Sequence, residues 1–180
     1  MIKKLLLIFF TILFLESFGG NYSPYLPKGT LIKVIPQTTL STEQLEEKSV
    51  VYFIAPSDVW VQEEKAVEKG DIFKGYVSML KMPVLGVNAA MKINITDIIK
   101  QDGSMYEFSG KILYKNSYMI GGNLTNRASY NKTVHPRRVY GNPFGGTLQY
   151  VPSGEYEEGQ HVKINMRDSM FIELDEDYYI

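Results

Sequence analysis

The chain has no cysteine, one tryptophan and two histidines among its 180 residues. Without cysteine it forms no disulfide and offers no thiol nucleophile, thiolate metal ligand or thiol redox centre. Its stability must therefore come from a buried hydrophobic core. It also lacks an excess of charge of one sign, because 19 basic and 20 acidic residues leave a net charge of −1. Such a chain has no global electrostatic footprint for nucleic acid, and we expect no nucleic-acid partner.

Short motifs for catalysis or metal binding are also missing. The two histidines, His135 and His161, belong to no H-E-x-x-H or other short ligand spacing. No serine lies in a G-x-S-x-G elbow, and the stretch GDIFKG lacks the Walker A spacing and a following helix. We therefore predict no catalytic residues, no metal site and no cofactor. A histidine would act only if the fold brought it to a carboxylate such as Asp168 or Glu157.

Two groups of acidic residues each have a structural and a chemical interpretation. Asp58 and Asp71 lie near strand ends, where they could form a carboxylate pair, but aspartate at such places commonly accepts hydrogen bonds from turn N–H groups. We predict that both residues cap turns. The acidic residues 175–177 lack the EF-hand spacing and its central glycine, so we interpret them as a solvated acidic tail and not as a calcium site.

The N-terminal segment has the pattern of a secretory signal peptide. Lys3 and Lys4 precede the apolar run LLLIFFTILFL, and Ser17 and Gly19 are small residues before a cleavage point. The run is short for a membrane span, although an uncleaved anchor is the alternative. No cysteine follows it, which excludes a lipoprotein anchor. We predict a signal peptide at 1–19, a single β domain at 20–180, and export to the periplasm or cell envelope, with membrane contact only through the signal peptide.

A glycine turn followed by a lysine-bearing strand is written three times. Glycine can adopt the positive φ that such a turn requires. The irregular spacing of the copies excludes a solenoid, whose repeats need a fixed period. We interpret the segments as strands that start at similar corners of one closed sheet, where His161 packs as Ile32 and Phe73 do. The segments are PKGTLIKV at 27–34, EKGDIFKGYV at 68–77 and EEGQHVKI at 157–164, with Gly29, Gly70 and Gly159.

The rest of the chain is rich in short β patterns. No window outside residues 1–19 has a helical period, and Gly75 interrupts its strand, which predicts a bulge or a close backbone approach. We predict an all-β fold: a single compact β-barrel or sandwich of short, mainly antiparallel strands, with an irregular Gly/Tyr-rich loop insertion at 115–160. The expected strands are 30–35, 49–55, 58–62, 72–80, 91–99, 105–108, 111–114, 118–120, 147–151, 161–166 and 170–174.

The Gly/Tyr-rich section holds the candidate binding residues. Tyrosine gives a large contact area at low entropic cost, and loops on a rigid β scaffold are common binding sites. The rings could equally cap the open ends of a barrel, and the three basic residues form only a small patch for an acidic polymer or lipid headgroup. The candidates are Tyr118, Tyr130, Lys132, His135, Arg137, Arg138, Tyr140, Phe144, Tyr150 and Tyr156.

Four segments together resemble a recurring pattern of uncharacterised bacterial envelope proteins: LPKGTLIKV, VVYFIAPSDVWV, VEKGDIFKGYV and DGSMYEF. The pattern is distantly similar to the β-barrel domain of the TrbI/VirB10 conjugation and secretion-channel proteins, over about half of the chain that follows the signal peptide. The resemblance implies a β-barrel fold and an envelope location. The chain lacks the long Pro-rich linker and the amphipathic helical hairpin of the channel proteins, which argues against a pore. No catalytic residues carry over.

These observations predict an exported, non-catalytic envelope protein that binds or scaffolds another envelope component. One alternative is a carbohydrate- or peptidoglycan-binding module that uses the same aromatic rings. The other is a hydrolase of unknown substrate, which would require a pocket where a histidine meets a carboxylate. The expected partner is an envelope protein or a cell-wall polymer.

Overall fold

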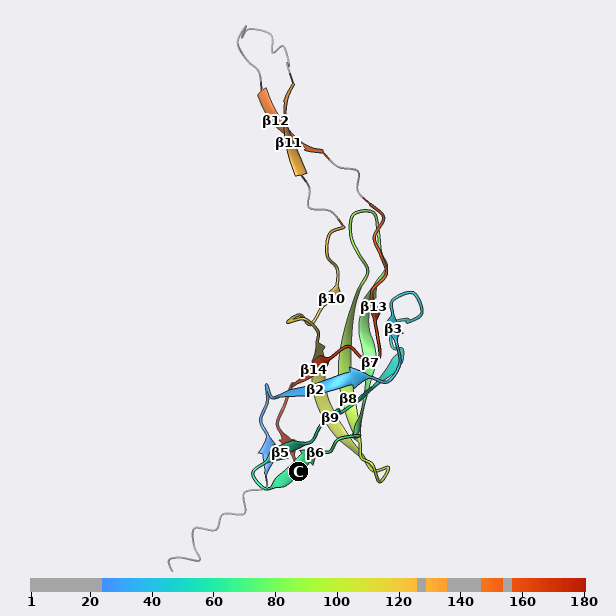
Figure 1. Ribbon diagram of the computed structural model, residues 1–180, viewed down its shortest axis with the longest axis vertical. Helices are drawn as coiled ribbons and strands as arrows, with labels where there is room; N and C mark the ends of the chain where they lie inside the picture. The colour runs from blue at the N-terminus through green and yellow to red at the C-terminus, as the bar shows by residue number, and fades with distance from the viewer. Residues whose placement is uncertain (1–23, 126–128, 136–146, 154–156) are drawn as a thin grey trace, which may run out of the picture.

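A computed structural model describes residues 24–125, 129–135, 147–153 and 157–180 of the chain (Figure 1). The predicted signal peptide lies outside these residues. Within them the regular structure is all β, as predicted, and no helix there is long and apolar enough to cross a membrane. For 129–135 and 147–153 only the backbone is described.

The main sheet is an antiparallel β-barrel. Its strands follow the order β8-β7-β4-β2-β14-β9, and β9 pairs again with β8, which closes the sheet; β10 adds a further strand beside β8. Closure removes the sheet edges that a sandwich would leave, so the fold is a barrel, the first of the two predicted architectures. The strands are β2 (Leu31–Pro36), β4 (Val50–Ile54), β7 (Ile72–Lys81), β8 (Ala90–Ile99), β9 (Met105–Leu113), β10 (Ile120–Gly121) and β14 (Met170–Leu174).

Within the described residues, four two-stranded sheets accompany the barrel. Figure 1 shows the β11–β12 hairpin beyond one end of the barrel, while β5, β6 and the C-terminus lie at the other end. The pairs are β1 (Tyr25–Leu26) with β15 (Tyr178–Tyr179), β3 (Leu40–Ser41) with β13 (Lys163–Ile164), β5 (Val59–Val61) with β6 (Glu64–Val67), and β11 (Ser129–His135) with β12 (Thr147–Ser153).

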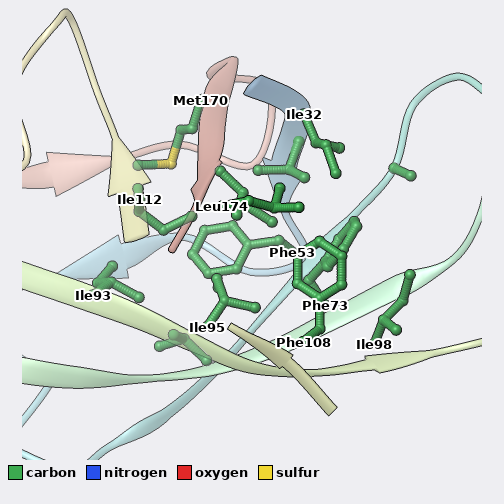
Figure 2. Packing of buried hydrophobic residues seen from close by; sticks show 14 of the residues in the cluster. Ile32, Phe53, Phe73, Ile93, Ile95, Ile98, Phe108, Ile112, Met170 and Leu174 are labelled. Atoms are coloured by element: carbon green, nitrogen blue, oxygen red, sulfur yellow. The ribbon is translucent and has the colours of Figure 1, made fainter. Parts of the chain in front are cut away.

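Alternation along the strands builds the core. In β2, Ile32 and Val34 are buried while Leu31 and Lys33 face outward, and β7 and β8 alternate in the same way. Aromatic rings fill the centre: Phe73 and Phe108 meet edge to face, with centroids 5.0 Å apart. Figure 2 shows the side chains converging from several strands, among them Ile32, Phe53, Phe73, Ile93, Ile95, Ile98, Phe108, Ile112, Met170 and Leu174.

The first glycine segment forms a corner between β1 and β2. Gly29 has φ +82°. The Gly29 N–H donates to the Leu174 carbonyl at 2.9 Å, and the Leu174 N–H donates to the Thr30 carbonyl at 3.1 Å. Three residues after Leu174, the Asp177 carboxylate accepts a hydrogen bond from the N–H of Lys28 at 2.7 Å. The turn therefore locks the start of β2 onto the end of β14.

The second glycine segment forms the same kind of corner, with equivalent hydrogen bonds. Gly70 has φ +102°, its N–H donates to the carbonyl of Ala55, and the N–H of Ala55 donates to that of Asp71, each at 2.9 Å. Three residues after Ala55, Asp58 accepts from the N–H of Lys69 at 2.6 Å. Strands β5 and β6 flank this corner as β15 and β1 flank the first, so the prediction of similar corners in a closed sheet is confirmed for two copies.

The third segment is different, and the interpretation of it as an equivalent corner is wrong. Gly159 lacks a positive φ, and a Cβ there would lie 2.0 Å from the Val87 carbonyl oxygen, so this glycine permits close backbone packing. The following strand is only β13, and His161 precedes it with an exposed side chain. The predicted packing role of His161 is therefore also wrong.

Two local predictions have clear outcomes. Gly75 sits at a register shift of β7 against β8, and an added Cβ would lie 2.4 Å from the carbonyl oxygen of Asn94, so the bulge and the close approach are both confirmed. Strand β11, however, was not predicted from the sequence. This strand pairs along its whole length with β12, and β12 includes the predicted strand at 147–151.

Candidate functional site

Most of the predicted binding residues lie in or beside the β11–β12 hairpin. The backbone register places Tyr130 opposite Pro152, Lys132 opposite Tyr150, and His135 opposite Thr147. Arg137, Arg138, Tyr140, Phe144 and Tyr156 lie outside the described residues. Tyr118 is thus the one predicted binding residue whose side chain the structure describes.

Tyr118 lies at a pocket in the barrel wall. The pairing of β8 with β9 runs only as far as Asn94 opposite Lys111, and beyond that point β8 pairs with β10 instead. The two strands therefore separate, and a pocket of about 310 Å³ lies at this point. Its lining consists of Lys92, Ile93, Asn94, Lys111, Ile112, Tyr118, Glu173 and Asp175.

The wall pocket carries balanced charge. The hydroxyl of Tyr118 donates to the Glu173 carboxylate, and this hydrogen bond is the main reason that the pKa of Tyr118 is raised. Lys111 pairs with Asp175 at 2.7 Å. Lys92 also lines the pocket, so two lysines face two carboxylates and the described lining carries no net charge. The pairing of Asp175 also corrects its predicted place in a solvated tail.

A second feature is an apolar surface at the end of the barrel where β7 connects to β8. Met82, Val84, Leu85 and Leu124 are 57 %, 60 %, 65 % and 65 % exposed, and we call these four residues the apolar end. Isolated bridges hold the backbone here, pairing Val84 with Val87, Val87 with Leu124, and Leu85 with Glu158. The exposed side chains therefore stand on an ordered scaffold.

Sequence reasoning missed the apolar end although a signal was present. The stretch MPVLGV at 82–87 is an apolar run that contains proline and glycine and lies between two strong strand patterns. Proline and glycine favour a connection over a strand, and consecutive apolar residues in a connection are unusual without a function. Reading both signals together would have identified it.

The geometry does not favour the hydrolase alternative in the described part of the chain. His161 Nδ1 lies 3.2 Å from Thr42 Oγ1, and no cluster of three histidine or acidic side chains suited to a metal occurs among the described residues. Thr42 is buried and its hydroxyl also accepts the N–H of Val162 at 3.0 Å. His161 therefore belongs to a structural contact between β3 and β13.

The turn-capping prediction for the two aspartates is confirmed. Asp58 accepts the Lys69 N–H at 2.6 Å, and Asp71 accepts the Glu68 N–H at 2.9 Å. The Lys69 N–H, followed by the Lys65 side chain, lowers the pKa of Asp58. Asp71 differs from Asp58 because its side chain is also buried.

Comparison with known proteins finds distant likeness among solved structures. No family model matches the chain, and no curated protein matches it. The fold is similar to a solved structure of ComB10 of the Com type IV secretion system of Helicobacter pylori. The TM-score is 0.49 and the identity 15 %, over 86 % of this chain and 89 % of that one. A likeness of this degree carries no inference about function, which has to come from the residues themselves.

Proposed function

We propose that the chain is a non-catalytic, exported binding module of the cell envelope that docks another envelope protein through its apolar end. The observation that carries this proposal is the group of four large apolar side chains exposed together on a backbone fixed by bridges. Contiguous exposed apolar patches are uncommon on monomeric proteins and mark interaction surfaces. A fixed backbone also reduces the entropy lost on binding.

Charge around the apolar end indicates the kind of partner. Glu157 and Glu158 are exposed, and Glu158 is bridged directly to Leu85; the exposed Lys81 precedes Met82, so the described charge here is acidic by one. A protein surface with an apolar centre and a basic rim would complement this arrangement, since rim charges steer association and select partners. Exposed carboxylates beside the patch also disfavour insertion into an anionic lipid surface.

Leu124 of the apolar end lies within the Gly/Tyr-rich section. It precedes the β11–β12 hairpin, and Glu157 follows the hairpin. The predicted tyrosines of the hairpin would therefore extend the same contact surface. Changing Tyr130 and Tyr140 together to Ala should weaken partner capture, and unchanged capture would remove these tyrosines from the surface while leaving the apolar end in place.

Site-specific photo-crosslinking in cells tests the proposal. A photoreactive residue at Leu85 should give a discrete crosslinked protein in the envelope fraction, identified by mass spectrometry. The same residue at Leu31, an exposed leucine on β2 that is 51 % exposed, is the matched control and should give no such product. Equal products at both positions, or none at Leu85, would refute the proposed surface.

Charge substitution gives an independent readout. Leu85→Asp should abolish co-purification of the crosslinked protein without lowering stability, because the side chain is already in water. Leu31→Asp should leave co-purification unchanged. Fractionation of cells that express the chain with and without residues 1–19 tests the export step, and retention of both forms in the cytoplasm would overturn it.

A further inference from the structure

A pocket of about 460 Å³ lies beside the second glycine corner. The turn before β7, the connection between β8 and β9, and strand β15 contribute to it, so it belongs to the end of the barrel that carries β5, β6 and the C-terminus (Figure 1). We call it the corner pocket. It is lined by Lys65, Ala66, Glu68, Asp71, Lys100, Gln101, Asp102, Ser104, Tyr106, Tyr178, Tyr179 and Ile180.

A buried ion pair forms part of the corner pocket. Asp71 is 1 % exposed, and its Oδ2 accepts hydrogen bonds from Lys100 Nζ at 2.9 Å and from the Glu68 N–H at 2.9 Å. Lys100 Nζ also donates to the Ala66 carbonyl at 2.8 Å. An ammonium has three N–H donors, so two are used, and the side chain of Lys100 keeps 19 % exposure at the pocket.

The other oxygen of the buried carboxylate has no partner. Asp71 Oδ1 is buried and makes no hydrogen bond with the residues that the structure describes. An unmade hydrogen bond on a buried polar group costs about 1–3 kcal/mol. A donor that reaches this oxygen would recover that free energy, whereas an apolar ligand would not.

The duplicated corner supplies an internal comparison. The position of Asp71 corresponds to Thr30 in the first corner, where the same backbone bonds form around Gly29. The Thr30 hydroxyl donates to the Pro27 carbonyl at 2.6 Å, inside its own turn. In the first corner the residue equivalent to Glu68 is Pro27, which has no N–H, whereas Asp71 caps the Glu68 N–H. That cap explains an acceptor at this position, but it does not explain the pairing with Lys100 or the unbonded Oδ1.

Aromatic rings cover the other side of the corner pocket. Tyr106 and Tyr179 are 51 % and 64 % exposed, and Tyr178 stands half-buried between them and the core, with its ring 4.9 Å from that of Phe108. Burial, followed by the Asp71 charge, raises the pKa of the Tyr178 phenol. Pockets that combine aromatic walls with a few oriented polar groups are typical of small-molecule sites.

We infer that the corner pocket binds a neutral, polyhydroxylated ligand, namely a short stretch of glycan. Sugar hydroxyls both donate and accept, so one can accept the third N–H of Lys100 at the pocket, and one that penetrates below the surface can donate to Asp71 Oδ1, which solvent does not reach in this structure. An anion would meet the carboxylates of Glu68, Asp71 and Asp102, and a cation would have to displace Lys100 from Asp71. This site uses tyrosines other than those first considered for carbohydrate binding, and it is separate from the apolar end.

Titration with neutral trisaccharides tests the inference. The probes are triacetylchitotriose and maltotriose, and binding is measured by saturation-transfer NMR and by tryptophan fluorescence. The single tryptophan, Trp60, has its ring 5.2 Å from Nζ of Lys65, which lines the pocket. At least one probe should bind with a Kd of about 1 mM. Tyr106→Ala/Tyr179→Ala should weaken it at least about tenfold. Tyr52→Ala, at an exposed tyrosine of β4 outside the pocket, should not.

The polar half of the site has its own variant. Asp71→Thr/Lys100→Met converts the pocket to the neutral state of the first corner and should also abolish binding while the protein stays folded by circular dichroism. Absence of binding to both trisaccharides, or equal loss in Tyr52→Ala, would overturn the inference. Binding of inorganic phosphate in place of the sugars would overturn it as well, because the pocket would then be an anion site.

Discussion

Removing Lys100 should destabilise the protein far more than its position at a surface pocket suggests. In Lys100→Met the Asp71 carboxylate, 1 % exposed, loses its charge partner, and the Ala66 carbonyl loses a donor 2.8 Å away. Stripping one partner from a buried ion pair typically costs 3–5 kcal/mol. Because Lys100 retains 19 % exposure and water can replace part of the lost bonding, we expect about 3 kcal/mol.

Equilibrium unfolding measures this loss directly. For a domain of this size about 3 kcal/mol corresponds to a fall in Tm of roughly 6–12 °C, with a matching shift of the urea midpoint at unchanged slope. The double variant Asp71→Thr/Lys100→Met should lose only about 1 kcal/mol, because no charge remains buried and the Thr hydroxyl can accept a hydrogen bond from the Glu68 N–H in place of the carboxylate.

The cycle of single and double variants isolates the pair. Asp71→Thr alone should cost about 1 kcal/mol, because Lys100 keeps some exposure and its ammonium can turn to water. The favourable coupling should therefore be about 3 kcal/mol, well above the scatter expected for independent sites. A loss below about 1 kcal/mol in Lys100→Met, or a double variant as unstable as the sum of the two singles, would refute the reasoning. Either result would mean that Asp71 is not held as a buried charge by Lys100.

Three further predictions address the glycines, the acid limb and the wall pocket. Gly75→Ala should cost about 3 kcal/mol in urea unfolding, because its Cβ would lie 2.4 Å from a β8 carbonyl oxygen. Gly29→Ala, with φ +82° but open space, should cost only about 1–2 kcal/mol; equal losses would contradict this. The Lys69 N–H lowers the pKa of Asp58 from 3.8, so stability present above pH 3.8 should fall below it, and less steeply in Asp58→Asn. The pKa of Tyr118 is raised above 10.0, so its stabilisation should be full below pH 10 and lost as pH rises further. Ultraviolet titration of Tyr118→Phe should lack this late-ionising phenol.

Sequence patterns predicted the parts of the fold that depend on local chemistry. Alternating apolar residues predicted β8, and the glycine turns predicted two corners. Both signals, a period of two and a glycine that can take a positive φ, lie within a single stretch of chain. Barrel closure depends on the pairing of β14 with β2 and with β9, strands that lie far from β14 in sequence. No local pattern specifies such partners, so the sequence left barrel and sandwich open.

The misses have equally physical causes. Strand β11, SYNKTVH, is largely polar and lacks alternating apolar residues, so it carries little local strand signal. The third glycine segment matches the first two in letters, but Gly159 is needed for its lack of a side chain against Val87 and not for its φ. A glycine in sequence does not reveal which of these two properties the fold uses.

The duplicated corner also explains why sequence alone did not locate the corner pocket. Reading Asp71 as a turn cap was correct, yet Thr30 shows that capping accounts for only part of what the residue does. The difference appears when the hydrogen bonds of the two corners are compared one by one. What remains at the second corner is a buried charge, its lysine partner and one unbonded oxygen beside exposed tyrosines. Lys100 and the Glu68 N–H satisfy Asp71 Oδ2, whereas burial of the unbonded Oδ1 disfavours folding. A ligand donor at this corner would offset that remaining cost.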